Sequence, residues 1–130
     1  MLTAEALAEL VSDYNPKSNS AKIIEAYKYG KIKHEGQFRK SGEPYFTHPV
    51  SVAKILAEQR LDDATIITAL LHDTIEDTGS TKQEISKLFS HEISELVDGV
   101  TKLTKIQLSS METQEAENIR KLLMAIAQDI

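Results

Sequence analysis

Residues 63–73 of the chain read Asp-Ala-Thr-Ile-Ile-Thr-Ala-Leu-Leu-His-Asp. The first nine of these residues are apolar on most sides, which predicts a helix buried at the centre of the protein. The helix leads directly into two adjacent polar residues, His72 and Asp73. A buried helix with this ending places a histidine and a carboxylate at the edge of the core.

Segments on both sides of this helix repeat apolar residues with the spacing of helix faces. The predicted inward-facing sets are Leu7, Leu10 and Val11; Ile23, Ile24 and Tyr27, with Ile32 at the end; Val52, Ala53, Leu56 and Ala57; Ile85, Leu88 and Phe89; Ile93, Leu96, Val97 and Val100; and Ala116, Ile119, Leu122, Leu123, Ile126 and Ile130. The sequence has no alternating strand pattern and no internal repeat, so we expect an all-α fold.

Residues that favour helix starts precede several of these segments. The candidate caps are Thr47, Thr81 with Glu84, Ser90, and Ser109 with Glu112. Pro49 suits the first turn of the helix that Thr47 is expected to cap. Residues 39–45 lack periodicity and contain Gly42 and Pro44, which predicts a loop.

Length and composition indicate one soluble globular domain over residues 1–130, since 41% of the residues are hydrophobic and 27% are charged. The absence of cysteine excludes disulfides and a thiolate metal site. No apolar run approaches the roughly 20 residues of a membrane helix, and the N-terminus lacks a signal-peptide pattern. We therefore expect a cytoplasmic protein with no membrane association.

The formal net charge of -5 argues against a general nucleic-acid binder, which usually carries a basic surface. A polyphosphate substrate stays possible if positive charge is concentrated locally. A bound metal ion or the basic pair Arg39 and Lys40 could supply that charge. The alternative for the pair is an ordinary exposed basic surface.

His72 and Asp73 carry side chains that suit manganese, iron or zinc. The alternative is that His72 is a hydrogen-bonded core histidine and Asp73 a residue at a helix end, although an aspartate at a helix C-terminus opposes the helix dipole. His48 lies 24 residues earlier, where a loop meets a helix, and it could add a third ligand or only support the turn.

Glu76 and Asp77 follow three residues after Asp73. Two carboxylates beside a metal can orient or deprotonate a water molecule and handle the proton of a leaving group. The alternative is a solvated acidic pair before the next helix cap.

These residues lie in strings that closely resemble the hydrolase domain of the RelA/SpoT homologue family. The strings are residues 39–45 (Arg-Lys-Ser-Gly-Glu-Pro-Tyr), 48–49 (His-Pro), 71–77 (Leu-His-Asp-Thr-Ile-Glu-Asp) and 98–103 (Asp-Gly-Val-Thr-Lys-Leu). The likeness covers about residues 20–130. The His-Asp doublet alone is shared by a large superfamily. Its combination with the seven-residue string at positions 39–45 is specific for the RelA/SpoT homologue family.

The resemblance implies an HD-domain-like helical bundle, a bound manganese ion, and hydrolysis of guanosine tetra- or pentaphosphate to GDP or GTP plus pyrophosphate. By position, the resemblance implies that the metal ligands are His48, His72 and Asp73. It implies that the catalytic acidic pair is Glu76 and Asp77. It further implies that the loop that binds the guanosine side of the substrate contains Arg39, Lys40 and Ser41.

The chain departs from the family pattern at one point. Members of the family carry a fourth metal ligand, an aspartate in a Lys-Leu-Ala-Asp-Arg-Leu-His-Asn-type motif that follows the segment resembling residues 119–130. We therefore expect a bundle that is incomplete at the C-terminus, with weak metal binding and impaired activity. The alternatives are a non-catalytic remnant that binds guanosine nucleotide or a protein partner, and another HD phosphohydrolase that acts on ordinary nucleotides.

The apolar stripe of the last predicted helix leads to a further expectation. Ile119, Leu122, Leu123, Ile126 and Ile130 would form an exposed patch if further helices normally covered them, and such patches drive association. We therefore expect a homo-oligomer in which the final helices dock on a neighbouring copy or are exchanged between copies.

Overall fold

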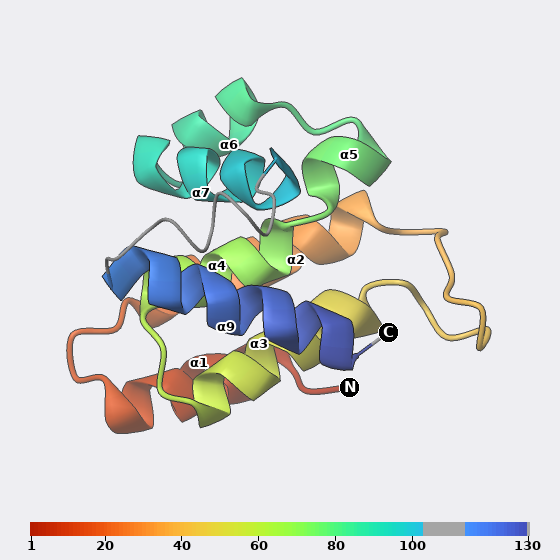
Figure 1. The fold of residues 1–130 in the computed structure, drawn as a ribbon. Coiled ribbons are helices and arrows are strands. Elements are labelled where there is room, and N and C mark those ends of the chain that lie inside the picture. The colour runs from red at the N-terminus through yellow and green to blue at the C-terminus, as the bar shows by residue number, and fades with distance from the viewer. Residues whose placement is uncertain (103–113, 130) are drawn as a thin grey trace.

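The computed structural model of the chain describes residues 1–102 and 114–129, which form a helical bundle (Figure 1). The helices are α1 (Ala4–Tyr14), α2 (Ser20–Lys33), α3 (Thr47–Glu58), α4 (Asp63–Leu71), α5 (Thr74–Thr78), α6 (Lys82–Leu88), α7 (His91–Lys102) and α9 (Gln114–Gln128). In these residues the only β-type pairing is an isolated bridge between Phe38 and Pro44. The expected all-α fold is confirmed.

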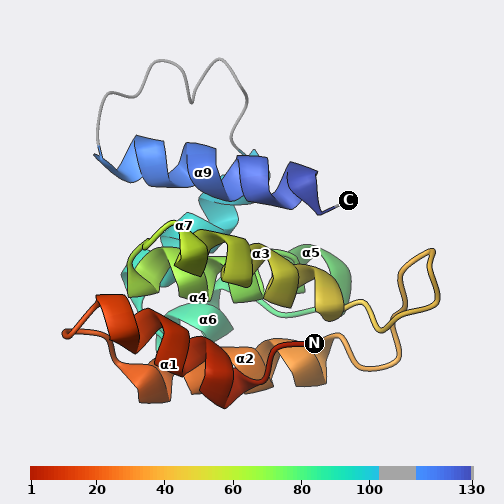
Figure 2. The same ribbon diagram turned by 90° about the horizontal axis from the view of Figure 1, so that it is seen from below.

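Helix α4 is the centre of the bundle, as its apolar sequence predicts. It contacts α2, α3, α7 and α9, and its residues 65–71 are all buried. Seen from below, α9 lies on one side of α3 and α4, while α1 and α2 lie on the other (Figure 2). Because the core surrounds α4, its C-terminal end has a fixed position, and His72 follows there.

Gly30 in α2 allows a close approach to the end of α4. A Cβ atom at this position would lie 2.6 Å from the Phe46 ring and 2.9 Å from the backbone oxygen of Leu70. Backbone cannot move aside as a flexible side chain can, so any larger residue would push α2 away from α4. The glycine therefore helps to fix the turn that carries His72.

Two of the predicted caps are confirmed. Thr81 Oγ1 accepts a hydrogen bond of 3.1 Å from the backbone nitrogen of Glu84, which starts α6. Ser90 Oγ accepts one of 3.0 Å from the nitrogen of Ile93, which starts α7. These bonds satisfy backbone donors that have no partner within the helix. The box of Ser109 and Glu112 lies outside the described residues.

The prediction that Thr47 caps α3 is wrong. Thr47 is the first residue of the helix, and Phe46 occupies the cap position without a side-chain hydrogen bond. The Thr47 hydroxyl donates instead to the backbone oxygen of Pro44 at 2.9 Å, so it closes the turn that leads into the helix. The inward placement of Ile32 and Leu88 is also wrong, because their exposed fractions are 68% and 39%.

Helix α9 covers its own apolar stripe by packing on α3 and α4. Ile119 and Leu122 are buried, and Leu123 and Ile126 are partly buried against the core. The premise of the expected homo-oligomer, an exposed stripe on this helix, is therefore wrong for these residues. Ile130 lies outside the described part of the chain.

Among the described helices, none is long and apolar enough to span a membrane.

Candidate metal centre and adjoining cleft

Three predicted ligands converge where α3, α4 and α5 meet. His48 is the second residue of α3, and His72 and Asp73 link the end of α4 to α5. One ligand atom from each residue lies within 4.8 Å of the other two. Both histidines are buried, and Asp73 is partly buried. Helices α3 and α4 pack against each other, so the bundle brings together residues that are 24 positions apart.

The hydrogen bonds of His72 leave one ring nitrogen available. Its Nδ1 lies 2.6 Å from the backbone oxygen of Ala69, and because a carbonyl only accepts, Nδ1 must donate. Its buried Nε2 lies 3.0 Å from Asp73 Oδ2 but has no hydrogen-bond partner among the described residues. A neutral His72 thus directs a lone pair toward a carboxylate, an unfavourable contact that a proton or a cation relieves. These residues fit a divalent metal ion.

The pKa shifts of this pair agree with a site for positive charge. Burial acts to lower the pKa of His72, but the neighbouring Asp73 carboxylate outweighs burial and raises it. Burial acts to raise the pKa of Asp73, but His72 and the Tyr45 hydroxyl outweigh burial and lower it to about 2. Asp73 is therefore ionised at neutral pH, as a metal ligand must be.

Tyr45 supports Asp73 from the loop side. Its hydroxyl donates a 2.6 Å hydrogen bond to Asp73 Oδ2. Its ring lies 4.9 Å from that of His34 and 5.9 Å from that of His48, measured between centroids. Burial and Asp73 raise the pKa of Tyr45, so the phenol keeps its proton and can donate. The sequence contained a signal for this residue, since Tyr45 stands three positions before His48, but it was not assigned to the site.

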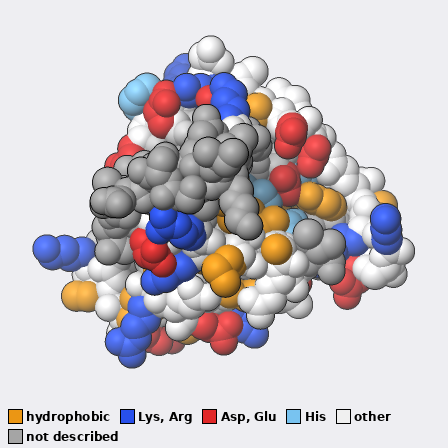
Figure 3. Space-filling view, viewed as in Figure 1, with side chains coloured by type: hydrophobic (Ala, Val, Ile, Leu, Met, Phe, Trp, Pro, Cys, Tyr) orange, Lys and Arg blue, Asp and Glu red, His pale blue; other side chains and the backbone are white. Residues whose placement is uncertain are grey.

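A cleft of about 620 Å³ adjoins the metal centre. Its lining residues are Phe38, Arg39, Lys40, Ser41, Tyr45, His48 and Asp129. In the space-filling view, histidine side chains lie in a hollow beside acidic and apolar side chains (Figure 3). The three residues predicted to bind the guanosine side of a substrate therefore line one cleft with a predicted metal ligand.

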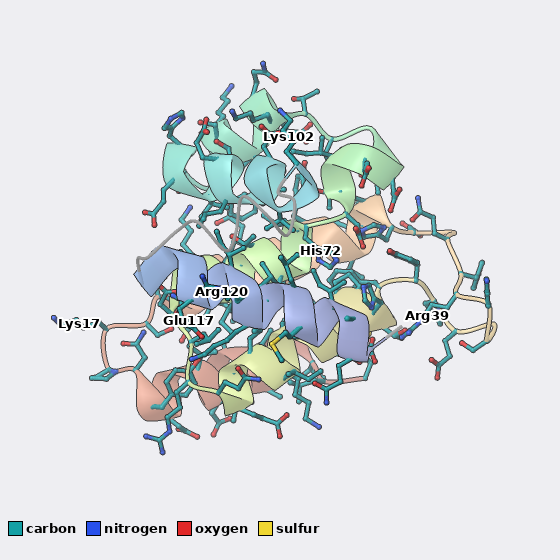
Figure 4. All side chains as sticks on the ribbon, viewed as in Figure 1. Lys17, Arg39, His72, Lys102, Glu117 and Arg120 are labelled. Carbon is teal, nitrogen blue, oxygen red and sulfur yellow. The ribbon has the colours of Figure 1, made fainter. Side chains whose placement is uncertain are left out.

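Arg39 is not an ordinary exposed cation. Its Nη1 lies 3.2 Å from Asp129 Oδ2, and its Nη2 donates to the backbone oxygen of Asp129 at 2.7 Å. The side chain reaches from the loop toward the C-terminal end of α9 (Figure 4). Lys40 and Ser41, by contrast, are exposed. Sequence reasoning missed Asp129, because no local pattern indicates that α9 ends beside the loop.

The acidic pair lies beside the metal centre but outside the ligand cluster. Glu76 and Asp77 are exposed residues of α5, three and four positions after Asp73. That spacing places them on the same face of one helical turn as Asp73. The backbone oxygen of Asp77 accepts a 2.8 Å hydrogen bond from Gln37 Nε2, which joins α5 to the segment before the loop.

Comparison with known proteins identifies the class of this domain. A family described as HD domain matches residues 26–130, and the chain belongs to that family. The chain is 52% identical over its full length to a protein named GTP pyrophosphokinase rsh from Brucella melitensis, of which it covers 17%. It is 48% identical over its full length to the protein named bifunctional (p)ppGpp synthase/hydrolase SpoT from Escherichia coli K12, of which it covers 18%.

A solved structure extends the likeness to three dimensions. It is described as a metazoan orthologue of SpoT that hydrolyses ppGpp and plays a role in starvation responses. The TM-score is 0.69 at 28% sequence identity, over 87% of this chain and 70% of that one. The resemblance to RelA/SpoT homologues is therefore confirmed. The chain spans less than a fifth of the length of the curated relatives described above.

Proposed function

We propose that this chain is a (p)ppGpp hydrolase domain that cleaves guanosine 3′,5′-bis(diphosphate) to GDP and pyrophosphate with manganese. One observation carries the proposal: His48, His72 and Asp73 converge beside a cleft lined by Arg39, Lys40 and Ser41. A cation site next to a loop with basic side chains suits a polyphosphate. The hydrolase names of the relatives from Escherichia coli support the same reaction.

The side chains of the cluster define what the site can hold. Two imidazoles and one carboxylate suit manganese, iron or zinc, so the choice of manganese rests on the resemblance. When bound, such an ion polarises a phosphoryl oxygen and makes water a stronger nucleophile near neutral pH. His48, His72 and Asp73 would hold the ion, and catalytic metal sites commonly use three protein ligands.

The remaining residues act on the water and on the nucleotide. We assign to Glu76 and Asp77 the orientation of the attacking water and the acceptance of its proton, because they share a helix face with Asp73. Lys40 is exposed at the cleft and supplies positive charge for phosphate. Ser41 offers a hydroxyl beside it. Local cations thus allow a protein with a net charge of -5 to bind a polyanion.

A second candidate function is nucleotide binding without turnover. The observation that favours it is the position of the acidic pair, because Glu76 and Asp77 are exposed and lie outside the ligand cluster. If neither carboxylate reaches the attacking water, Lys40 and Ser41 can still bind a nucleotide in the cleft. In this reading the cleft holds a guanosine nucleotide while hydrolysis does not follow.

The test is incubation of the chain with ppGpp and Mn²⁺, with release of pyrophosphate followed over time. We expect release that stops on chelation, is lost in His72→Gln, and persists in His91→Gln, which alters an exposed histidine of α7. A longer protein that includes downstream sequence should be assayed in parallel. Tight ppGpp binding without release in either protein would support the second candidate. Hydrolysis of GTP in place of ppGpp would indicate another HD phosphohydrolase.

A further inference from the structure

Asp129 contacts both parts of the site at once. It follows the last residue of α9, and its side chain is 25% exposed. Its Oδ2 lies 3.1 Å from His48 Nδ1 and 3.2 Å from Arg39 Nη1. Its backbone oxygen accepts a second bond from the same guanidinium, at 2.7 Å from Nη2. One residue therefore joins a candidate metal ligand to the candidate substrate loop.

The contact with His48 determines where the imidazole carries its proton. A carboxylate accepts hydrogen bonds and cannot donate them, so Nδ1 of His48 must be the donor. In a neutral ring the lone pair then lies on Nε2, the atom left to bind a metal. Asp129 does not belong to the three-residue ligand cluster, so it contacts His48 without serving as a ligand in this arrangement.

The contact with Arg39 holds the loop against α9. The backbone oxygen of Asp129 lies just beyond the C-terminal end of that helix, where the helix dipole favours a cation. Helix α9 is itself fixed by packing on α3, with Leu122 and Ala125 buried. Residues 39–45 otherwise project from the bundle (Figure 1), so this clamp gives the loop a defined position beside the metal centre.

We propose that Asp129 is a positioning residue that holds His48 in the Nδ1-protonated form and ties the Arg39 loop to it. The metal centre and the nucleotide loop then assemble as one unit through the end of α9. The inference rests on the proposed role of His48 as a metal ligand. It adds a residue that lies 81 positions from His48 in the sequence.

The first arm of the test observes His48 in the metal-free chain. Nitrogen NMR of the histidine rings, at a pH well above the usual histidine pKa of about 6.5, distinguishes the two neutral tautomers. We expect the Nδ1-protonated form in the natural chain and a mixture in Asp129→Ala. Asp129→Asn keeps an oxygen acceptor and should retain most of the Nδ1-protonated form. Glu117→Gln, which removes a carboxylate of α9 far from Arg39 (Figure 4), should change nothing.

The second arm titrates the same variants with Mn²⁺ and follows the ion by electron paramagnetic resonance. Loss of a partner that orients a ligating histidine costs about 10–100-fold in metal affinity. We expect that loss in Asp129→Ala, a smaller loss in Asp129→Asn, and none in Glu117→Gln. Melting curves should show that all the variants are folded under the assay conditions.

The two arms separate this inference from the proposed function. If the natural chain binds Mn²⁺ and Asp129→Ala keeps both its affinity and its His48 signals, the role of Asp129 is overturned and the metal site stands. If the natural chain binds no Mn²⁺ but His48 responds to Asp129→Ala, the positioning role stands and the proposed metal site fails. Tighter metal binding in Asp129→Ala would overturn the inference, because Asp129 would then compete with the ion for His48.

Discussion

The inner and outer parts of the candidate site are built differently. His48 and His72 lie in the core at helix ends that other helices hold in place, whereas Glu76, Asp77 and Lys40 are exposed. The inner residues therefore have their positions set by packing before any ligand arrives. The outer residues are not held by packing, so we expect a ligand in the cleft to restrict their side chains.

Burial of the inner histidine His72 lowers the stability of the fold. The Nε2 atom of His72 is buried without a hydrogen-bond partner among the described residues. An unsatisfied buried polar atom destabilises a protein by about 1–3 kcal/mol. His34 Nε2 is equally unsatisfied but lies outside the ligand cluster, so this cost supports a role in binding only at His72, where His48 and Asp73 converge with it.

The largest effect expected is loss of metal binding on removal of an inner ligand. His72→Gln should lower Mn²⁺ affinity by more than about 100-fold, since outer-shell changes alone cost 10–100-fold. Calorimetric titration measures this loss. His91→Gln is the matched control, because His91 is an exposed histidine outside the cluster. Equal Mn²⁺ affinity in the two variants would show that His72 is not a metal ligand.

The next effect separates the outer part from the inner part. Glu76→Gln combined with Asp77→Asn should slow pyrophosphate release by about 10²–10⁴-fold, the usual contribution of general acid–base groups. Metal affinity and helical content should change little, since both residues are exposed and lie outside the cluster. The assay belongs in whichever length of the protein shows turnover. Normal turnover in the double variant would contradict the catalytic assignment.

Tyr45→Phe tests whether the hydrogen bond from the loop to Asp73 helps the inner residues to bind metal. The change removes the hydroxyl that donates to Asp73 Oδ2 but keeps the ring that packs on His34. Because Asp73 loses an orienting partner, Mn²⁺ affinity should fall by about 10-fold, the low end for such contacts. The melting temperature of the metal-free variant serves as the control. Unchanged affinity would show that the contact has no part in metal binding.

The smallest effect distinguishes two adjacent basic residues. Arg39→Ala removes the bonds to Asp129 Oδ2 and to the Asp129 backbone oxygen. The free energy of unfolding should therefore fall. The decrease should be only about 1 kcal/mol, because solvent partly screens the pair. Lys40→Ala, at an exposed position, should stay within about 0.5 kcal/mol of the natural chain. Urea denaturation compares them. Nucleotide affinity should fall in both variants, and equal stability would contradict the clamp.

The sequence predicted most of the fold because local signals suffice for it. The buried helix α4 has the predicted bounds, and the caps at Thr81 and Ser90 depend on residues three positions apart. The cap predicted at Thr47 is wrong because Thr47 is already the first residue of α3, and its hydroxyl bonds back to Pro44.

The candidate site was predictable in part for the same reason. His72 and Asp73 are adjacent, and His48 lies in a recognisable string, so local patterns indicated them. Asp129 depends on how α9 packs across α3, which no short pattern encodes. The exposed stripe expected on α9 was wrong because Leu122 and its neighbours already find cover within the chain.

We expect His48, His72 and Asp73 to hold one divalent metal ion beside the cleft. Anomalous X-ray scattering from a crystal of the chain grown with Mn²⁺ would locate that ion. We expect one strong peak in contact with all three side chains, with Nε2 of both histidines facing it, and no such peak in His72→Gln crystals. A peak held only by Glu76 and Asp77, or none near the histidines at saturating Mn²⁺, would contradict the account.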